Sequence, residues 1–583
     1  MSEIQPAVNE IQADGSSTSS KPEDRFDKRY LVCAGLIIAL AAFLRFLLIA
    51  HYEVWLDEAY CFIVARKPIL DIFRDLRSDN GPPLYYILLH YWMMLFGDGP
   101  TALRSLSAVL STASVAVILF WRTPWFGRMA RLVAGFAFAI TPLAIYYGQE
   151  ARMYALALFF VTLSMVFLER VLRLGGVRNW APLAVTTALA LYSSYIAIFL
   201  IPLGYIVIAI RYLYDNDQAA AQRTATGLVA AHVAAALLFA PWLPTFFRQP
   251  SAAATQWMGP YWQAANKPML PLQSLSIMTV GGAYYPEFIR QLGQGPRRTE
   301  AMREEIRAGR ETRILPRILT PVPPVVPLII TLALAAAAFL FALRRGEGAF
   351  PYRAFLIGWV ALALFVPFFF SYFRPMYFAG RYELTGIPAF AAIFGVGVSR
   401  WPKGARVAAF AVAALLFAYT WGYVQCYPSA GMNIERAKIL SDIAPKGAVP
   451  VCEVFEYATM YYYMGERRDE LQFMTFPRDT YHHAAWIDYD KWLVPPQEWT
   501  EPRNQLLREA GDTWQEAIRK AGPGGRVIFV RTPNDNGGGW IKAMDGAIAS
   551  ALGEAAVPDT GQMDYEPAIS RPDKGLLALD VKR

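Results

Sequence analysis

The chain has 583 residues, of which 55% are hydrophobic, 14% aromatic and only 17% charged. This composition is too apolar for an ordinary soluble domain, and four cysteines are too few for a disulfide framework. The net charge of +8 does not indicate nucleic-acid binding, because the basic residues lie between apolar stretches and no nucleic-acid motif is present. The composition therefore indicates an integral membrane protein.

The first 29 residues are polar and Ser-rich, so we predict a disordered cytoplasmic tail over 1–29. Apolar stretches of about 20 residues, the length that crosses a bilayer, follow along the chain. They predict eleven transmembrane helices at 30–50, 102–121, 131–147, 153–169, 180–194, 195–212, 224–245, 323–343, 354–371, 383–399 and 405–425. Lys and Arg recur in every second loop, which places the N-terminus in the cytoplasm. A twelfth span near 268–285 is the alternative, and it would invert every later loop.

This topology predicts a transmembrane domain over 30–425 with outer loops at 51–101 and 246–322. Beyond it, strand-like runs alternate with polar helical stretches, which indicates an extracytoplasmic α/β domain over 426–583. Within the first outer loop, 59–77 has apolar residues at helical spacing and reads as one amphipathic helix in the membrane interface. The apolar stretch 84–96 is too short to span and indicates a re-entrant or interfacial helix.

Ionisable and amide side chains gather on the predicted outer side of the membrane. They are Asp57, Glu58, Asp79, Asn80, Arg104, Glu150, Arg152, Arg381 and Glu383. Ionisable groups at membrane depth usually face a polar cavity or pair with one another, although each alone could simply be solvated at the interface. Of two adjacent carboxylates, one suits a general base and the other can orient the acceptor or hold a divalent cation. Arginines nearby suit a phosphate.

Tyrosines accompany these groups. Tyr85, Tyr154 and Tyr195 could line a groove for a sugar or a prenyl chain, or they could belong to the aromatic belt of the interface. From the residues alone, we predict an outward-facing membrane site for a phosphorylated or lipid-linked substrate.

Four motifs, "VWLDEAY", "NGPPLYYILLHYWMMLFGDGPTALRSLSA", "YYGQEARMYALAL" and "AGRYELTGIPAF", resemble those of the GT-C membrane glycosyltransferases. The resemblance is nearest to the branch with protein-mannosyltransferase-like, aminoarabinose-transferase-like and rhizobial galacturonosyltransferase-like enzymes. It implies a GT-C fold, a polyprenyl-phosphate sugar donor, transfer outside the cytoplasm with inversion at the anomeric carbon, and a catalytic base in the first outer loop.

Carried onto this chain, the resemblance implies that Asp57 is the base, that Glu58 is its neighbour, and that Glu150 is a second acidic residue. If a divalent cation is a cofactor, Asp57 and Glu150 are its candidate ligands. The resemblance makes Arg104, Arg152 and Arg381 candidates for the donor phosphate. The full set of predicted substrate-binding residues adds Tyr85, Asp79, Asn80, Tyr154, Tyr195 and Tyr382 to these arginines. One departure is Gly81, which stands before Pro82 where family members commonly have a histidine, and this weakens a metal role there.

The sequence therefore predicts an inverting glycosyltransferase of the bacterial inner membrane, acting on a glycolipid, polysaccharide or protein acceptor. Two other classes stay open, a transporter or flippase for lipid-linked sugars and a non-catalytic assembly subunit that binds lipid carriers. The sequence has no evident internal repeat of the kind common in transporters, and its carboxylates lie at the outer edge, which favours the enzyme.

Overall fold

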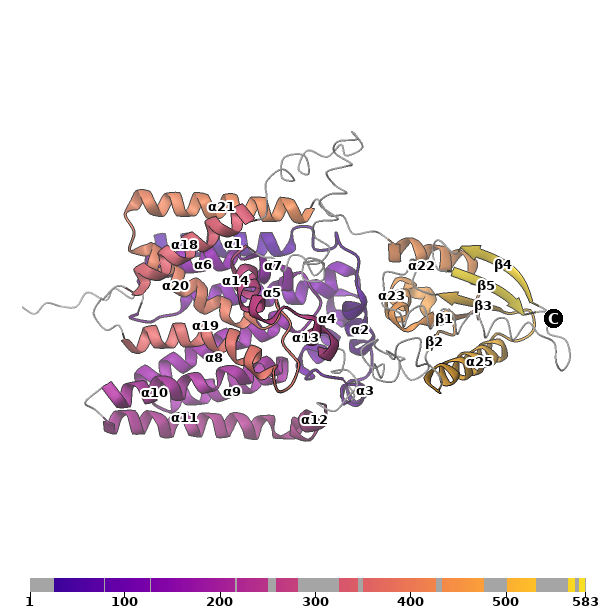
Figure 1. Ribbon diagram of the computed structural model, residues 1–583, viewed down its shortest axis with the longest axis horizontal. Coiled ribbons are helices and arrows are strands. Elements are labelled where there is room, and N and C mark those ends of the chain that lie inside the picture. Colours follow the sequence, from indigo (N-terminus) through magenta and orange to yellow (C-terminus); the bar gives the residue numbers. More distant parts are fainter. Residues whose placement is uncertain are drawn as a thin grey trace, which may run out of the picture.

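The computed structural model describes residues 26–249, 258–280, 325–343, 350–425, 432–476, 501–530, 565–571 and 576–581, apart from 78, 126 and 215–217. Residues 1–25 of the predicted tail 1–29, most of the outer loop 246–322 and parts of 426–583 lie outside these residues, whereas 28–29 belong to the first helix. Figure 1 shows a bundle of helices with a smaller sheet-containing domain at one end.

Helices of the bundle run roughly side by side (Figure 1). They are α1 (Lys28–Phe46), α5 (Pro100–Phe120), α6 (Arg128–Ala139), α7 (Pro142–Gly148), α8 (Tyr154–Leu174), α9 (Val177–Ser193), η1 (Tyr195–Leu200), α10 (Pro202–Tyr214), α11 (Gln218–Phe239), α18 (Val325–Leu343), α19 (Phe350–Phe370), α20 (Ile387–Ser399) and α21 (Lys403–Gln425). Shorter helices fill the connections. They are α2 (Leu56–Ala65), α3 (Ile69–Asp75), α4 (Leu84–Phe96), η2 (Ala240–Trp242), α12 (Leu243–Arg248), α13 (Met258–Ala264), η5 (Lys267–Met269), α14 (Leu270–Val280) and η7 (Glu383–Gly386).

Six of the described helices are long and apolar enough to cross a membrane, or seven if the bent pair α6–α7 counts as one span. Every predicted span overlaps a described helix. The number that crosses the bilayer stays a prediction. Of the alternative span 268–285, the described part forms α14, and 281–285 lie outside the described residues.

Two predicted helices are interrupted at prolines. The span 131–147 breaks between α6 and α7, which meet at 58°, because Pro142 forces Thr141 into an extended conformation with ψ 118°. The predicted amphipathic helix 59–77 is also wrong, since Pro68 divides it into α2 and α3. Its predicted place in the interface is wrong for α2, whose residues Asp57–Ala65 are all buried. Apart from Asp57 and Glu58, α2 is apolar on every side, which is typical of a helix that packs all round.

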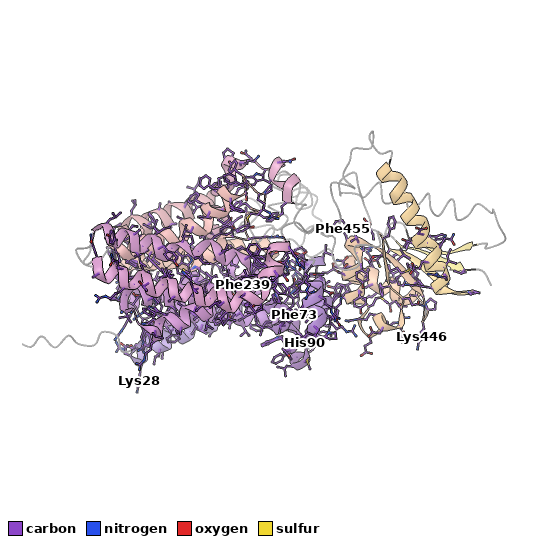
Figure 2. The ribbon with its side chains drawn as sticks, turned by 90° about the horizontal axis from the view of Figure 1, so that it is seen from below. Lys28, Phe73, His90, Phe239, Lys446 and Phe455 are labelled. Carbon is purple, nitrogen blue, oxygen red and sulfur yellow. The ribbon has the colours of Figure 1, made fainter. Side chains whose placement is uncertain are left out.

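The bundle has one basic end. Arg128 pairs with Asp27 at 2.7 Å, and the Arg122 guanidinium lies 4.6 Å from the Phe26 ring centroid, so this loop surrounds the start of α1. Figure 2 places Lys28 far from the domain that carries Phe455, whereas Phe73 and His90 lie near it. The end of the bundle that bears α2 lies opposite the basic end and near the domain that carries Phe455, and we call it the domain-facing end.

Close helix contacts inside the bundle rely on small residues. A Cβ atom on Gly395 of α20 would lie 2.4 Å from the Ala130 carbonyl oxygen and 2.9 Å from the Ala134 backbone nitrogen of α6. Because these are backbone atoms, they cannot turn aside. Gly395 therefore sets how closely α20 approaches α6.

The C-terminal domain contains a five-stranded mixed sheet in the order β2-β1-β3-β5-β4. Its elements are α22 (Met432–Ile443), β1 (Val449–Glu453), α23 (Val454–Tyr463), η8 (Gly465–Glu470), β2 (Met474–Phe476), α25 (Glu501–Ala521), β3 (Arg526–Val530), β4 (Tyr565–Arg571) and β5 (Leu576–Val581). β1 is parallel to β2 and β3, whereas β5 is antiparallel to β3 and β4. Ile528 packs with α22 residues, and Phe529 stacks on Trp514 of α25, so helices cover both faces of the sheet.

We expect Gly395→Ala to destabilise the bundle by about 1–3 kcal/mol, because the added methyl group overpacks the α6–α20 contact. The melting temperature in detergent, followed by tryptophan fluorescence, measures the loss. Gly404→Ala is the matched control, because a Cβ on Gly404 meets no atom within 4 Å. Equal melting temperatures for both variants would contradict the tight contact.

Candidate active site

The first turn of α2 presents the two adjacent carboxylates at the domain-facing end. Asp57 is 8% exposed and Glu58 1% exposed. Free N–H groups at a helix N-terminus favour acidic side chains there, and the Trp55 N–H donates to Glu58 Oε2 at 3.4 Å. Although adjacent in sequence, the two carboxylates pair with different arginines.

Glu58 forms a buried ion pair with Arg104 of α5. Arg104 Nε donates to Glu58 Oε1 at 2.7 Å, and Arg104 Nη2 donates to Glu58 Oε2 at 2.6 Å. Arg104 also donates to the carbonyl oxygens of the segment that leads into α2, namely those of Ile49, Tyr52 and Glu53, at 2.8–2.9 Å. These contacts use all five N–H groups of the guanidinium. We therefore correct the predicted role of Arg104, which positions the site and has no N–H left for a donor phosphate.

Glu58 also holds the loop between α7 and α8, which contains "GQEAR". Glu58 Oε1 accepts the Ala151 N–H at 2.8 Å. The Gln149 side-chain amide donates to the Leu44 and Leu47 carbonyl oxygens at 3.2 and 2.8 Å, which ties the same loop to the end of α1. One carboxylate thus fastens α2, α5 and this loop together. The sequence prediction missed Gln149.

This arrangement brings Asp57 beside Arg152, with Asp57 Oδ2 3.5 Å from Arg152 Nη2. Arg152 is 8% exposed, and its Nη1 lies 3.5 Å from the Cys61 Sγ. Two buried polar atoms here have no hydrogen-bond partner among the described residues, Arg152 Nε and Glu150 Oε2. Buried polar groups are nearly always satisfied, so such atoms mark a place where a substrate can bind.

Arg381 adds a second guanidinium to this group. Its Cζ lies 6.0 Å from the ring centroid of Tyr154 and 4.8 Å from that of Phe378. Burial lowers the pKa of Arg381, but Tyr154, Tyr147 and the negative charge of Asp57 raise it, and the net pKa is raised. The structure thus gathers the predicted residues Asp57, Glu150, Arg152, Tyr154 and Arg381 in one place.

Glu383 holds the turn that presents Arg381. It is fully buried, and its oxygens accept the Tyr377 hydroxyl at 2.9 Å and the Gly380 N–H at 2.8 Å. Tyr377 also hydrogen-bonds to Ser274 of α14. Gly380 has a φ of +95°, a conformation that L-residues with side chains rarely adopt. A buried carboxylate and a glycine therefore fix this turn, and nothing in the sequence near Ser274 signals its part.

The remaining predicted residues lie in supporting contacts. Asp79 accepts weak hydrogen bonds from the hydroxyls of Tyr60 and Tyr86, at 3.3 and 3.4 Å. Tyr85 is fully buried against Ser107, and the Tyr382 hydroxyl donates to the Met376 carbonyl oxygen at 2.6 Å. Asn80 is half-buried beside Asp79.

Tyr195 is tied to a residue that the sequence analysis missed. Its hydroxyl donates to Gln249 Oε1 at 2.5 Å. The Gln249 amide in turn donates to the carbonyl oxygens of Leu76 and Gly81 at 2.7 and 3.2 Å. We therefore assign Tyr195 to the support of the 76–81 segment.

Burial raises the pKa of Glu150 to about 8, and the charges of Glu58 and Asp57 add to the rise more than Arg152 and Arg381 reduce it. Glu150 therefore carries a proton at neutral pH. Asp57 has Arg152 as its counter-charge. Two carboxylates in one site are thus set for different tasks by their surroundings.

Comparisons with known proteins bear on this arrangement. Residues 80–244 match the sequence model of the dolichyl-phosphate-mannose-protein mannosyltransferase family. The oligosaccharyltransferase of Archaeoglobus fulgidus, tethered with an acceptor peptide, is 11% identical with a TM-score of 0.52, over 90% of this chain and 72% of that one. The chain has the GT-C fold. The resemblance inferred from the four motifs is confirmed at the level of the fold.

Two further solved structures are similar to the chain. The same oligosaccharyltransferase, AglB, in complex with an inhibitory peptide and a dolichol-phosphate has 12% identity and a TM-score of 0.50, over 86% of this chain and 69% of that one. ArnT from Cupriavidus metallidurans, in the apo state, has 14% identity and a TM-score of 0.47, over 95% of this chain and 98% of that one. No curated protein matches the chain by sequence.

The sequence leaves metal dependence open, and one structure of the oligosaccharyltransferase contains Zn and sulfate. Within the described ranges of this chain, no group of three or more His, Cys, Asp or Glu side chains could hold a metal ion. Asp57 and Glu150 supply only two carboxylates, and Arg152 places positive charge among them, which disfavours a cation. The described residues therefore do not fit a metal, and we assign no step to one.

We expect Glu58→Gln to destabilise the protein by about 3–5 kcal/mol, because it leaves the Arg104 guanidinium buried without its counter-charge. Asp57→Asn is the matched comparison, since it alters the adjacent carboxylate, whose ion pair with Arg152 is longer. Melting temperatures of both variants in detergent separate the structural role of Glu58 from the predicted catalytic role of Asp57. A Glu58→Gln variant as stable as Asp57→Asn would contradict the structural role of Glu58.

The raised pKa of Glu150 predicts a pH-dependent stability. Between the ordinary value of 4.5 and about 8, the folded protein keeps a proton that the unfolded chain has lost, so stability falls as pH rises through this window. From about pH 6 to pH 8 this amounts to about 2–3 kcal/mol. Glu150→Gln imitates the protonated form, so its melting temperature should fall less over that range than the wild-type value.

The exposed Glu466 gives the matched control for this measurement, because Glu466→Gln removes a carboxylate that is in contact with solvent. Its melting temperature should follow the wild-type pH dependence. The same slope in wild type and in Glu150→Gln would show that Glu150 does not titrate in this range.

Proposed function

We propose that this protein is an inverting glycosyltransferase that moves a monosaccharide from a polyprenyl-phosphate donor to an extracytoplasmic acceptor, with Asp57 as general base. The observation that carries the proposal is the buried pair of Asp57 and Arg152, 3.5 Å apart at the domain-facing end. The dolichol-phosphate complex of the oligosaccharyltransferase, a fold relative, supports a lipid phosphate as the donor.

In this mechanism, Asp57 accepts the proton of an acceptor hydroxyl while that oxygen bonds to the anomeric carbon of the sugar. The bond between the anomeric carbon and the phosphate oxygen breaks, and the polyprenyl phosphate leaves with the electron pair. The acceptor attacks from the face opposite the phosphate, so the anomeric configuration inverts. General-base catalysis of this kind contributes about 10²–10⁴-fold to the rate.

Arg152 and Arg381 stabilise the negative charge that grows on the departing phosphate, and Arg152 Nε has no partner among the described residues to compete for it. Glu150, protonated at neutral pH, is suited to donate a hydrogen bond to a sugar or acceptor oxygen. Glu58 takes no proton in this scheme, because Arg104 and the Ala151 N–H already use both of its oxygens.

The position of the site suits such a donor. Its prenyl tail remains among the apolar helices, while the sugar phosphate lies at the domain-facing end. If the basic end around Arg122 and Arg128 lies in the cytoplasm, the site and the 426–583 domain are extracytoplasmic. We place the protein in the bacterial plasma membrane, with a glycolipid, polysaccharide or protein as acceptor.

We expect purified wild-type protein to transfer label from a polyprenyl-phosphate sugar, in a panel of donors and acceptors, and Asp57→Asn to lose about 10²–10⁴-fold of that rate. Asn keeps the shape of Asp but cannot accept the proton, and because the ion pair with Arg152 is the longer one, the melting temperature should fall less than in Glu58→Gln. Asp71→Asn is the matched control, because Asp71 is an exposed carboxylate of α3 that pairs with Arg74.

If Asp57→Asn transferred the sugar at the wild-type rate, Asp57 would not be the base. If wild type transfers label from no donor but moves lipid-linked sugars across proteoliposome membranes, the transporter reading would replace the enzyme.

A further inference from the structure

The C-terminal domain grips the short segment just before α2. The Val54 N–H donates to the Tyr463 hydroxyl of α23 at 2.6 Å. The Glu53 carboxylate accepts the N–H groups of Asn433 and Ile434, at 3.2 and 2.9 Å, in the first turn of α22. Two successive residues of the membrane domain are thus held by two helices of the C-terminal domain.

The same segment is bound on its other side by the candidate active site. The Glu53 carbonyl oxygen accepts Arg104 Nη2 at 2.9 Å, and the Trp55 N–H donates to Glu58. Asp57 follows Glu53 by four residues. A displacement of residues 53–54 therefore reaches Asp57 through a few extended residues and the first turn of α2.

Packing along α2 makes this connection stiff. Tyr462 meets the Phe62 ring edge-on with centroids 5.1 Å apart, and its hydroxyl donates to the Asp98 carbonyl oxygen at 3.1 Å. The Arg468 guanidinium lies 4.6 Å from the centroid of the same Phe62 ring. In Figure 1, α23 lies next to α2. These contacts couple α2 to the C-terminal domain along its length.

We propose that the C-terminal domain sets the position of the catalytic base, with Glu53 and Tyr463 as positioning residues that act through α2. The proposal rests on Asp57 being the base, as in the function above. A general base works only within hydrogen-bond reach of the proton it removes, and a displacement of about 1 Å can lower turnover about 10²-fold. Any acceptor that shifts α22 or α23 would thereby change the rate of transfer.

The contacts to Glu53 and Val54 are not needed merely to attach the C-terminal domain to the bundle. At the far end of α2, Arg66 already forms a salt bridge with Asp469 at 2.7 Å, and its Nη1 donates to the Tyr461 hydroxyl at 3.3 Å. These exposed contacts join the domain to α2 at the end remote from Asp57. The contacts to Glu53 and Val54 lie at the end that carries the base.

The test compares full-length variants that each alter one contact. Tyr463→Phe leaves the buried Val54 N–H without its acceptor, and Glu53→Gln weakens the hold on α22. For both we expect kcat about tenfold lower, with the KM for the polyprenyl-phosphate donor unchanged. Hydrogen exchange, measured by mass spectrometry, should become faster in 53–58, and the unsatisfied Val54 N–H should lower the melting temperature of Tyr463→Phe by a few degrees at most.

Tyr461→Phe is the matched control, since it removes one hydroxyl from the same helix at the contact with Arg66. It should leave kcat and the exchange of 53–58 unchanged. Equal effects in Tyr461→Phe and Tyr463→Phe would overturn the proposal in favour of general docking. The proposal would also be overturned if neither Glu53→Gln nor Tyr463→Phe changed kcat or the hydrogen exchange of 53–58. If Asp57→Asn kept its turnover, the proposed function would fail, whereas the exchange of 53–58 would still decide whether the domain holds this segment.

Discussion

The buried ion pair between Glu58 and Arg104 is the interaction on which the rest of the site depends. Taking both charges out of water costs several kcal/mol, and their attraction offsets this only when the remaining polar atoms are also satisfied. Here the Arg104 guanidinium donates hydrogen bonds to three backbone carbonyl oxygens before α2, and Glu58 accepts the Ala151 N–H. The pair therefore fixes the relative positions of three segments that are far apart in the sequence.

Because Arg104 neutralises Glu58, the neighbouring carboxylates differ in their surroundings. Asp57 faces Arg152 across 3.5 Å, whereas Glu150 is buried near two negative charges and its pKa rises to about 8. A site with three ionised carboxylates would repel an anionic phosphate. With Glu58 paired and Glu150 protonated, the positive charge of Arg152 and Arg381 prevails, and of these three carboxylates Asp57 is the one left for the proposed role of base.

Much of this fold could be predicted from sequence, because a bilayer imposes one length and one polarity on every span. All eleven predicted spans overlap described helices, and α4 has the predicted bounds 84–96. The misplaced elements were those decided by local or tertiary effects. Pro142 and Pro68 broke helices that periodicity alone would continue, and the burial of α2 depends on a domain some 400 residues later in the chain, as the contact of Val54 with Tyr463 illustrates.

The residues of the candidate site could be predicted from the sequence, but the partner of each charged group could not. Asp57, Glu150, Arg152 and Arg381 stand out because charged residues at a membrane edge are costly. The assignment of partners is a matter of geometry, so Arg104 and Arg152 look alike in sequence although one is saturated by protein and the other is not. Gln249 and Ser274 carry no charge and lie in loops or helix faces where such residues are ordinary. The roles of Gln249 and Ser274 can be seen only from the chain segments to which they hydrogen-bond.

The junction between the bundle and the C-terminal domain explains why such a site can work beside water. Tyr462 packs on Phe62 of α2, and the Tyr463 hydroxyl accepts the N–H of Val54, which is fully buried. Exclusion of water strengthens the interaction of the site's charges with each other and with an incoming phosphate. In the proposed function, a lipid-held donor would reach the site from the bundle and an acceptor from the side of the domain. If Asp57 is the base as proposed, the contact that covers this part of α2 is also the one through which an acceptor would act on it.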